Sequence, residues 1–255
     1  MQDLTVAFLQ FDQVWQDKPA NYSRIESYFQ ARQSIDLVLL PEMFHTGFSM
    51  QVSLADDWLE SEGLAFLKAL AHKNDFSIYT SIMVQDDGLY FNRGVLIAPN
   101  GNVQIYDKRK AFGLGGEDLY FTPGVKESIV SLKGWKINLQ ICYDLRFPEL
   151  VRNRITDDAE AYDLLLYVAN WPQKRSAHWD ALLKARAIEN QCYVVACNRV
   201  GIDGNQLVYN GRSQAIDFYG TYLSGPHEQE GLFVVQLAKD ALAEGRKSLP
   251  FLKDA

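Results

Sequence analysis

The sequence has little cysteine: Cys142, Cys192 and Cys197 are the three cysteines among its 255 residues. An odd number leaves at least one thiol outside any intrachain disulfide. Cys192 and Cys197 lie five positions apart on one predicted strand, so their side chains should point to opposite faces of a sheet. We therefore expect neither a disulfide nor a shared metal site between them, and a reducing cytoplasm suits such thiols.

Long apolar runs, basic clusters and metal-binding histidine patterns are also missing. No stretch approaches the length of a membrane span, and the first residues lack the basic region of a signal peptide. Basic residues number 25 against 32 acidic ones, a net charge of −7 with no basic stripe, which argues against nucleic acid or membrane partners. The four histidines show no metal-ligand spacing: His45, His72, His178 and His227. We expect no metal or organic cofactor.

Predicted strands and helices alternate along the chain without a linker. Apolar patterns predict strands over residues 4–11, 36–40, 76–83, 90–98, 103–106, 135–141, 164–169 and 193–198. Helices are predicted over residues 21–33, 58–73, 147–153 and 177–190. The repeated order is typical of a layered α/β domain, and we expect one domain over residues 1–255.

The most informative motif is Ile-Cys-Tyr-Asp-Leu-Arg-Phe-Pro-Glu at 141–149, which contains Cys142. A strand pattern precedes the cysteine, and Pro148 and Glu149 favour a helix after it. A thiol on such an elbow would face backbone N–H groups, which favour a thiolate and stabilise an oxyanion. Arg146 and Glu149 are expected to form an ion pair that braces the turn. Free cysteine is also commonly a small buried hydrophobe, so the local context leaves both interpretations open.

Two other predicted strands end on residues that a catalytic thiol needs. The apolar run 36–41 stops at Glu42, and ligands bind at the carboxyl ends of strands in open α/β sheets, so Glu42 is a candidate general base. The strand 103–106 leads to Lys108, whose ammonium would lower the pKa of the Cys142 thiol and neutralise an oxyanion. Taken singly, each of these residues is more commonly a solvated strand-end residue.

Taken together, the three strand ends give the chain a recognisable pattern. It resembles the nitrilase superfamily of carbon–nitrogen hydrolases, whose Glu–Lys–Cys triad lies on strand ends of this kind. The resemblance rests on Leu-Leu-Pro-Glu-Met-Phe (39–44), Tyr-Asp-Lys-Arg (106–109), Cys-Tyr-Asp-Leu-Arg-Phe-Pro-Glu (142–149) and Val-Ala-Asn-Trp-Pro (168–172), the last followed by the segment 184–194. It runs from Leu4 to about Leu237 and is strongest to the omega-amidases. It implies an α-β-β-α sandwich, of four-layer-forming type, and a homodimer or higher homo-oligomer.

The resemblance also implies roles for individual residues. Cys142 would attack a substrate amide, Glu42 would accept the thiol proton, and Lys108 with the backbone N–H of Tyr143 would hold the oxyanion. Glu117 matches a second family glutamate that supports the lysine and orients the substrate. The family often has a histidine two positions after the lysine, where this chain has Lys110, which makes Lys110 a rival for the role of Lys108.

Specificity is the least determined part of the prediction. An omega-amidase hydrolyses the terminal amide of a small 2-oxo dicarboxylate monoamide, such as 2-oxoglutaramate or 2-oxosuccinamate, whose carboxylate needs a cation. Arg175 is the first candidate for that cation and Lys174 the second, and the candidate pocket walls are Phe44, Phe48, Tyr143 and Trp171. His45 is expected to be a wall or loop residue.

Other functions fit the same sequence. A different amidase, a carbamoylase or a true nitrilase would use the same triad. A non-catalytic binding protein could also have this fold, but it would not need the triad. A papain-like protease is disfavoured, because no thiol–histidine context is visible.

Overall fold

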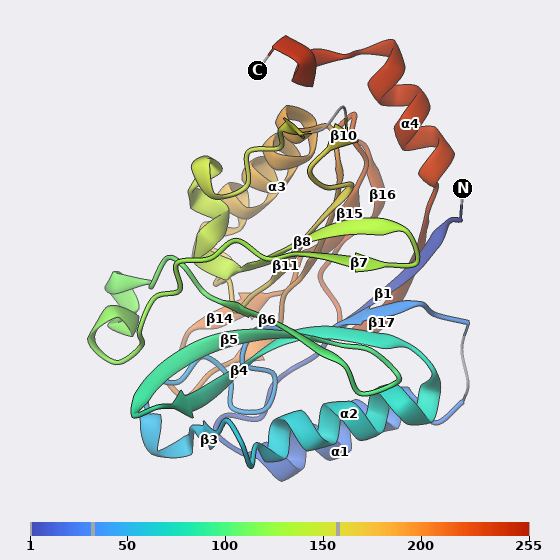
Figure 1. The fold of residues 1–255 in the computed structure, drawn as a ribbon. Helices are drawn as coiled ribbons and strands as arrows, with labels where there is room; N and C mark the ends of the chain where they lie inside the picture. Colours follow the sequence, from blue (N-terminus) through green and yellow to red (C-terminus); the bar gives the residue numbers. More distant parts are fainter. Residues whose placement is uncertain (1, 32–33, 157–158, 255) are drawn as a thin grey trace.

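The computed structural model describes residues 2–31, 34–156 and 159–254. Two sheets pack face to face, and helices cover their outer faces (Figure 1). One sheet has the strand order β17-β1-β2-β4-β5-β6, with β3 beside β4; the other has the order β16-β15-β12-β11-β8-β7. Helices α1 (Lys18–Tyr28) and α2 (Glu62–Asn74) cover the first sheet, and α3 (Ser176–Asn190) covers the second. The predicted α-β-β-α sandwich is confirmed.

The strands of the first sheet are β1 (Leu4–Gln10), β2 (Leu37–Leu39), β3 (Asp56–Asp57), β4 (Ser77–Asp86), β5 (Leu89–Ile97), β6 (Val103–Asp107) and β17 (Gly231–Leu237). Those of the second sheet are β7 (Ile129–Leu132), β8 (Trp135–Ile141), β11 (Leu164–Val168), β12 (Tyr193–Cys197), β15 (Ser213–Ile216) and β16 (Tyr222–His227). Two small ribbons pair β9 (Ile155–Thr156) with β10 (Ala159–Glu160) and β13 (Val200–Ile202) with β14 (Val208–Asn210). Helix α4 (Lys239–Ser248) follows β17.

The alternation of side chains along β1 shows why the strands read as continuous apolar runs. Val6 and Phe8 point between the sheets, where they join the cluster that contains Leu139 of β8. Ala7 and Leu9 point the other way, into the cluster under α1 and α2. Both faces are buried, as is usual for parallel strands covered on both sides.

Two helices begin at positions different from those predicted, because polar side chains cap them there. The helix predicted over 21–33 begins earlier, at Lys18, because the Asp17 carboxylate accepts the Ala20 N–H at 3.0 Å. It ends at Tyr28, and residues 32–33 lie outside the described residues. The helix predicted over 58–73 begins at Glu62, where Ser61 caps the Leu64 N–H at 3.0 Å.

The α-helix predicted over residues 147–153 is wrong. The chain forms two short 3₁₀ turns there, η4 (Cys142–Arg146) and η5 (Pro148–Leu150). Phe147 lies between them at φ −115° and ψ 89°. Pro148 disfavours the α conformation at the residue before it, so the first turn cannot continue into a helix.

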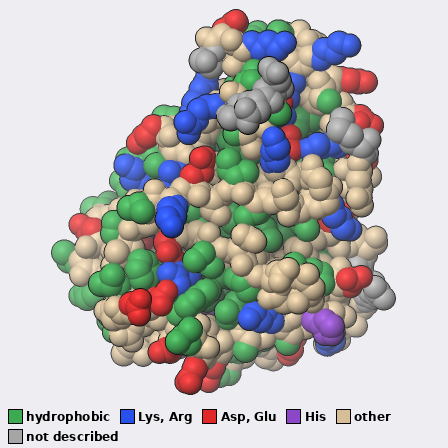
Figure 2. Space-filling model, in the orientation of Figure 1, with side chains coloured by type: hydrophobic (Ala, Val, Ile, Leu, Met, Phe, Trp, Pro, Cys, Tyr) green, Lys and Arg blue, Asp and Glu red, His purple; other side chains and the backbone are tan. Residues whose placement is uncertain are grey.

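The surface agrees with the charge balance of the sequence. Lys and Arg side chains are interspersed with Asp and Glu on the face shown in Figure 2. Among the described helices, none is long and apolar enough to span a membrane. One domain over residues 1–255 stays a prediction.

Candidate active site

The three residues predicted for catalysis meet at one end of the sandwich. Glu42 follows β2, Lys108 follows β6, and Cys142 follows β8, and all three are buried. The Lys108 ammonium donates to Glu42 Oε1 at 2.8 Å. The charges of Glu42 and Lys108 both act on the Cys142 thiol, so three residues far apart in the chain share one site.

Cys142 is the first residue of η4, directly after β8, and its backbone is strained. Its φ is +43°, a left-handed conformation that is uncommon for residues with a side chain. The buried Asp144 carboxylate holds this turn: Oδ2 accepts the Ile141 N–H at 3.1 Å and the Tyr106 hydroxyl at 2.8 Å, and Oδ1 accepts the Lys110 N–H at 3.0 Å. Burial raises the pKa of Asp144 to about 6. Asp144 lies within the motif 141–149, but nothing in that motif indicates this role.

The ammonium group of Lys108 lies between two carboxylates, those of Glu42 and Glu117. Its Nζ donates to both oxygens of Glu117, at 3.0 and 2.8 Å, as well as to Glu42. Burial on its own lowers the pKa of Lys108, but the charges of Glu117 and Glu42 outweigh it and the pKa rises. Lys108 therefore stays charged. Because the two oxygens of Glu117 can share one N–H, another N–H of the ammonium is available to an oxyanion.

Lys110, the rival of Lys108, lies away from this network. Its side chain is exposed and pairs with Glu149 at 3.7 Å. The expected ion pair between Arg146 and Glu149 is therefore wrong. The one-turn spacing of an α-helix, which would have brought them together, is absent at this point.

The predicted effect of Lys108 on the pKa of the Cys142 thiol is present, but other influences outweigh it. Burial is the largest influence and raises the pKa of the thiol well above its usual value, and the Glu42 charge raises it further. The Lys108 ammonium lowers it, but by less. Burial therefore disfavours the thiolate form of Cys142.

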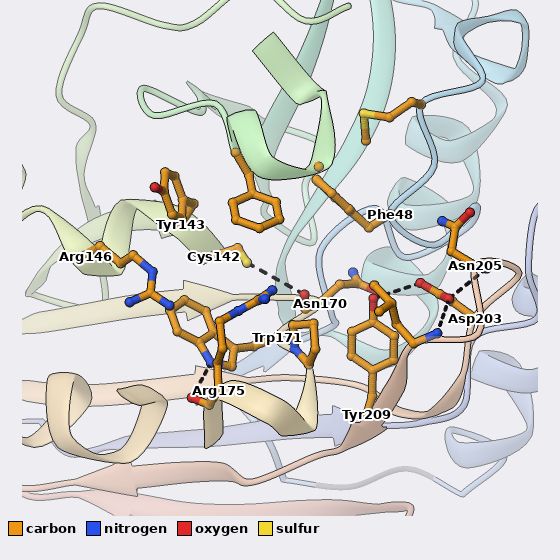
Figure 3. A pocket seen from close by; sticks show the side chains of 15 residues that line it. Phe48, Cys142, Tyr143, Arg146, Asn170, Trp171, Arg175, Asp203, Asn205 and Tyr209 are labelled. Atoms are coloured by element: carbon orange, nitrogen blue, oxygen red, sulfur yellow. Dashed lines mark hydrogen bonds between the residues drawn. The ribbon is translucent and has the colours of Figure 1, made fainter. Parts of the chain in front are cut away.

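Cys142 opens into a pocket of about 100 Å³ (Figure 3). This volume is well below the roughly 300–1,000 Å³ of sites for drug-sized ligands, so the pocket suits a small molecule. Phe48, Tyr143 and Trp171 line it, as predicted. Phe44 does not, because it belongs to the core under α1 and α2. His45 is also fully buried, stacked on Phe44 with ring centroids 4.9 Å apart.

Two arginines reach this pocket from the same side (Figure 3). Arg175 lies over the ring of Phe112 at 5.1 Å, and Arg146 lies over Trp171 at 4.6 Å. Burial and the charge of Arg175 lower the pKa of Arg146, but a guanidinium remains charged. Among the described residues, neither arginine is within 4.0 Å of a carboxylate. Arg175 was predicted here, whereas Arg146 was expected to be structural and Lys174 is absent from the lining.

The turn that carries Arg175 is anchored on both sides. The Trp171 indole N–H donates to the Arg175 carbonyl at 2.8 Å, and the Trp171 backbone N–H donates to Asn198 Oδ1 at 2.8 Å. Asn170, just before it, donates its backbone N–H to Glu42 Oε2 at 2.9 Å. The segment 168–172 thus holds both the Glu42 carboxylate and the turn that carries Arg175.

The structure adds two amides that sequence reasoning missed, Asn92 and Asn170. Asn170 lies inside the motif 168–172, but Asn92 lies in a strand with no local signal.

In the described part of the chain, no cluster of three or more His, Cys, Asp or Glu side chains is arranged to hold a metal ion.

Comparison with known proteins agrees with this geometry. Residues 5–247 match the family described as carbon–nitrogen hydrolase. The chain is 40% identical to "Omega-amidase YafV" of Escherichia coli, over 100% of this chain and 98% of that protein. It is 33% identical to "2-oxoglutaramate amidase" of Bacillus subtilis, over 98% and 96%.

A solved structure shares both sequence and fold. It is a carbon–nitrogen hydrolase superfamily protein from Xanthomonas campestris, XC1258, at 39% identity and a TM-score of 0.97, with 100% of this chain and 98% of that chain covered. These matches cover the full length of the chain, and they agree with the buried thiol, carboxylate and ammonium at three strand ends. The chain belongs to the carbon–nitrogen hydrolase family.

Proposed function

We propose that this protein is an omega-amidase, which hydrolyses the terminal amide of a small 2-oxo dicarboxylate monoamide such as 2-oxoglutaramate or 2-oxosuccinamate. The observation that carries the proposal is a small pocket lined by Cys142, Arg146 and Arg175, in which neither arginine forms an ion pair with a carboxylate among the described residues. A carboxylate at one end of a short substrate would meet these guanidinium groups, and the amide at the other end would meet the thiol. The names of the relatives support the same substrate class.

The first half of the reaction forms a thioester. Glu42 accepts the proton of the Cys142 thiol as the sulfur bonds to the amide carbon, and the carbonyl oxygen becomes an oxyanion. Lys108 and the backbone N–H of Tyr143 stabilise that charge. When the oxyanion collapses, the carbon–nitrogen bond breaks and Glu42 returns its proton to the leaving nitrogen, which departs as ammonia.

The second half clears the enzyme. A water molecule gives a proton to Glu42 while the water oxygen bonds to the thioester carbon. The carbon–sulfur bond then breaks. The proton returns to the sulfur, so one amide and one water yield one carboxylic acid and one ammonia. The role of Glu117 in this scheme is to hold Lys108, with which it shares hydrogen bonds at 2.8 and 3.0 Å.

Ammonia release across a set of substrates tests the proposal. We expect fast release from 2-oxoglutaramate and 2-oxosuccinamate, and slow release from butyramide, which has the four-carbon chain of 2-oxosuccinamate but no carboxylate. An N-carbamoyl amino acid and a short nitrile serve as the comparisons for a carbamoylase and a nitrilase. Faster turnover of either than of the 2-oxo amides would transfer the proposal to that activity, and no turnover of any would favour a binding protein.

Removing the cations should raise the Michaelis constant. Hydrogen bonds to a charged group contribute about 1.5–3 kcal/mol, so Arg175→Ala and Arg146→Ala should each raise KM for 2-oxoglutaramate by about 10- to 100-fold. The KM for butyramide should change little in these variants, because butyramide has no carboxylate for the arginines to bind. Lys174→Ala is the matched control, since Lys174 neighbours Arg175 but does not line the pocket. An unchanged KM in Arg175→Ala would remove that arginine from the substrate site.

We extend the proposal to a homodimer or higher homo-oligomer located in the cytoplasm. The family resemblance supports the oligomer, and the three free cysteines, Cys142, Cys192 and Cys197, suit a reducing compartment. Sedimentation of the purified chain measures the oligomeric state, and a monomer at micromolar concentration would contradict the proposed oligomer.

A further inference from the structure

Asn92 occupies the centre of the carboxylate network without being part of the expected triad. It lies on β5, and its side chain is almost wholly buried. Its side-chain amide donates to Glu42 Oε1 at 2.8 Å and to Glu117 Oε1 at 2.9 Å. The antiparallel pairing of β5 with β6 explains the position, because the Asn92 carbonyl also accepts the Lys108 backbone N–H at 3.0 Å.

The hydrogen bonds of Glu42 show what this contact does. A carboxylate offers about four acceptor positions, two on each oxygen. Oε1 accepts from Lys108 Nζ and from Asn92, and Oε2 accepts from the Asn170 backbone N–H at 2.9 Å. One position therefore remains, on Oε2. That oxygen alone has room to accept a proton.

Charge balance gives Asn92 a second task. Two buried carboxylates, Glu42 and Glu117, share a single ammonium, and two carboxylates in one site resist being ionised together. The Asn92 amide has two N–H donors and gives one to each carboxylate, which favours their charged forms without adding a charge.

We propose that Asn92 is a positioning residue that fixes the carboxylates of Glu42 and Glu117 around Lys108 and leaves Oε2 of Glu42 as the base for Cys142. This inference rests on the catalytic use of Glu42 and Cys142 in the proposed function, but it does not depend on the substrate. The titratable and charged groups that face Glu42 are Lys108, Glu117, Cys142 and Tyr79, the last from β4.

Asn92→Leu tests the proposal, because leucine has a similar size and no donor. General-base catalysis contributes about 10²–10⁴-fold, so kcat should fall by about 10²-fold while KM changes by less than about threefold. The acidic limb of the kcat/KM profile should move up by about one pH unit or more, as one carboxylate holds a proton to higher pH. Asn92→Ser, whose hydroxyl can donate to one carboxylate only, should give an intermediate shift.

The rate at which iodoacetamide alkylates Cys142 gives the same information without a substrate. Alkylation needs the thiol proton removed, so its pH profile should shift upward in Asn92→Leu together with that of kcat/KM. If 2-oxoglutaramate proves not to be a substrate, the alkylation profile still decides the role of Asn92.

Asn74→Leu is the matched control. Asn74 is a buried asparagine at the end of α2 that donates to the Leu70 carbonyl at 2.9 Å, far from the site. It should lose stability in thermal unfolding and keep both pH profiles. Profiles of Asn92→Leu and Asn92→Ser that coincide with those of the wild type would overturn the proposal, since Asn92 would then be a structural residue only. If Asn92→Leu does not fold, the Asn92→Ser profiles decide.

Discussion

Replacing Cys142 with alanine should abolish ammonia release from 2-oxoglutaramate, with a loss in kcat of about 10⁴-fold or more. The reason is that the thiol forms the covalent bond to the amide carbon, and an alanine has no group that can replace it. The pocket itself should survive, because alanine fits the space that the cysteine leaves. Ammonia release and binding of 2-oxoglutarate, an expected product, measured by calorimetry separate the two effects.

Cys192→Ala provides the comparison. Cys192 is also free and fully buried, but it lies just before β12 and does not line the pocket. This variant should keep its activity. Residual activity in Cys142→Ala above one hundredth of the wild-type rate would exclude a thioester on this residue.

Replacing Lys108 with methionine should reduce both activity and stability. Loss of one oxyanion donor costs about 10²–10³-fold in kcat in other hydrolases. The same change leaves Glu42 and Glu117 buried around no cation, and an uncompensated buried charge costs about 3–5 kcal/mol in the free energy of unfolding. Urea unfolding should show a smaller loss at pH 5 than at pH 8, because a proton on one carboxylate relieves the repulsion.

A double variant separates the two roles of Lys108. Glu117→Gln removes one of the two negative charges and keeps the side-chain shape, so Lys108→Met with Glu117→Gln should regain at least half of the lost unfolding free energy. It should regain no activity, because the oxyanion donor is still missing. Recovery of both together would mean that Lys108 acts in catalysis only by maintaining the fold, and full activity in the single variant would remove it from the mechanism.

The apolar patterns of the sequence predicted the strands well because a run of apolar residues is a local signal, which can be read without knowing what packs against it. The predicted strand 135–141 coincides with β8, and the other predicted strands agree with the observed ones to within a few residues at their ends. Helix boundaries depended on caps such as Ser61, which sequence reasoning did not use. The strands after residue 198 and the 3₁₀ turns after Cys142 were missed, because their form depends on partners distant in the chain.

The site shows where local information ends. Glu42, Lys108 and Cys142 are marked in the sequence because each ends a strand pattern, and their chain order carried the family resemblance. Nothing near Asn92 or Arg146 in the sequence shows that one lies between two carboxylates and the other faces the pocket. Those positions are set by the pairing of β5 with β6 and by the turn after Cys142.

The pKa of the Cys142 thiol is where the sequence-based expectation and the folded structure differ most. From the sequence, a nearby lysine and free N–H groups argued for a lowered pKa. In the folded chain, burial and the charge of Glu42 raise the pKa of Cys142 by more than Lys108 lowers it. The sequence by itself determined which chemical groups are present and which strands carry them. Only the tertiary structure decided how far each group is removed from water and which charges face it, because desolvation and Coulomb energy depend on distances between segments that the order of residues does not specify.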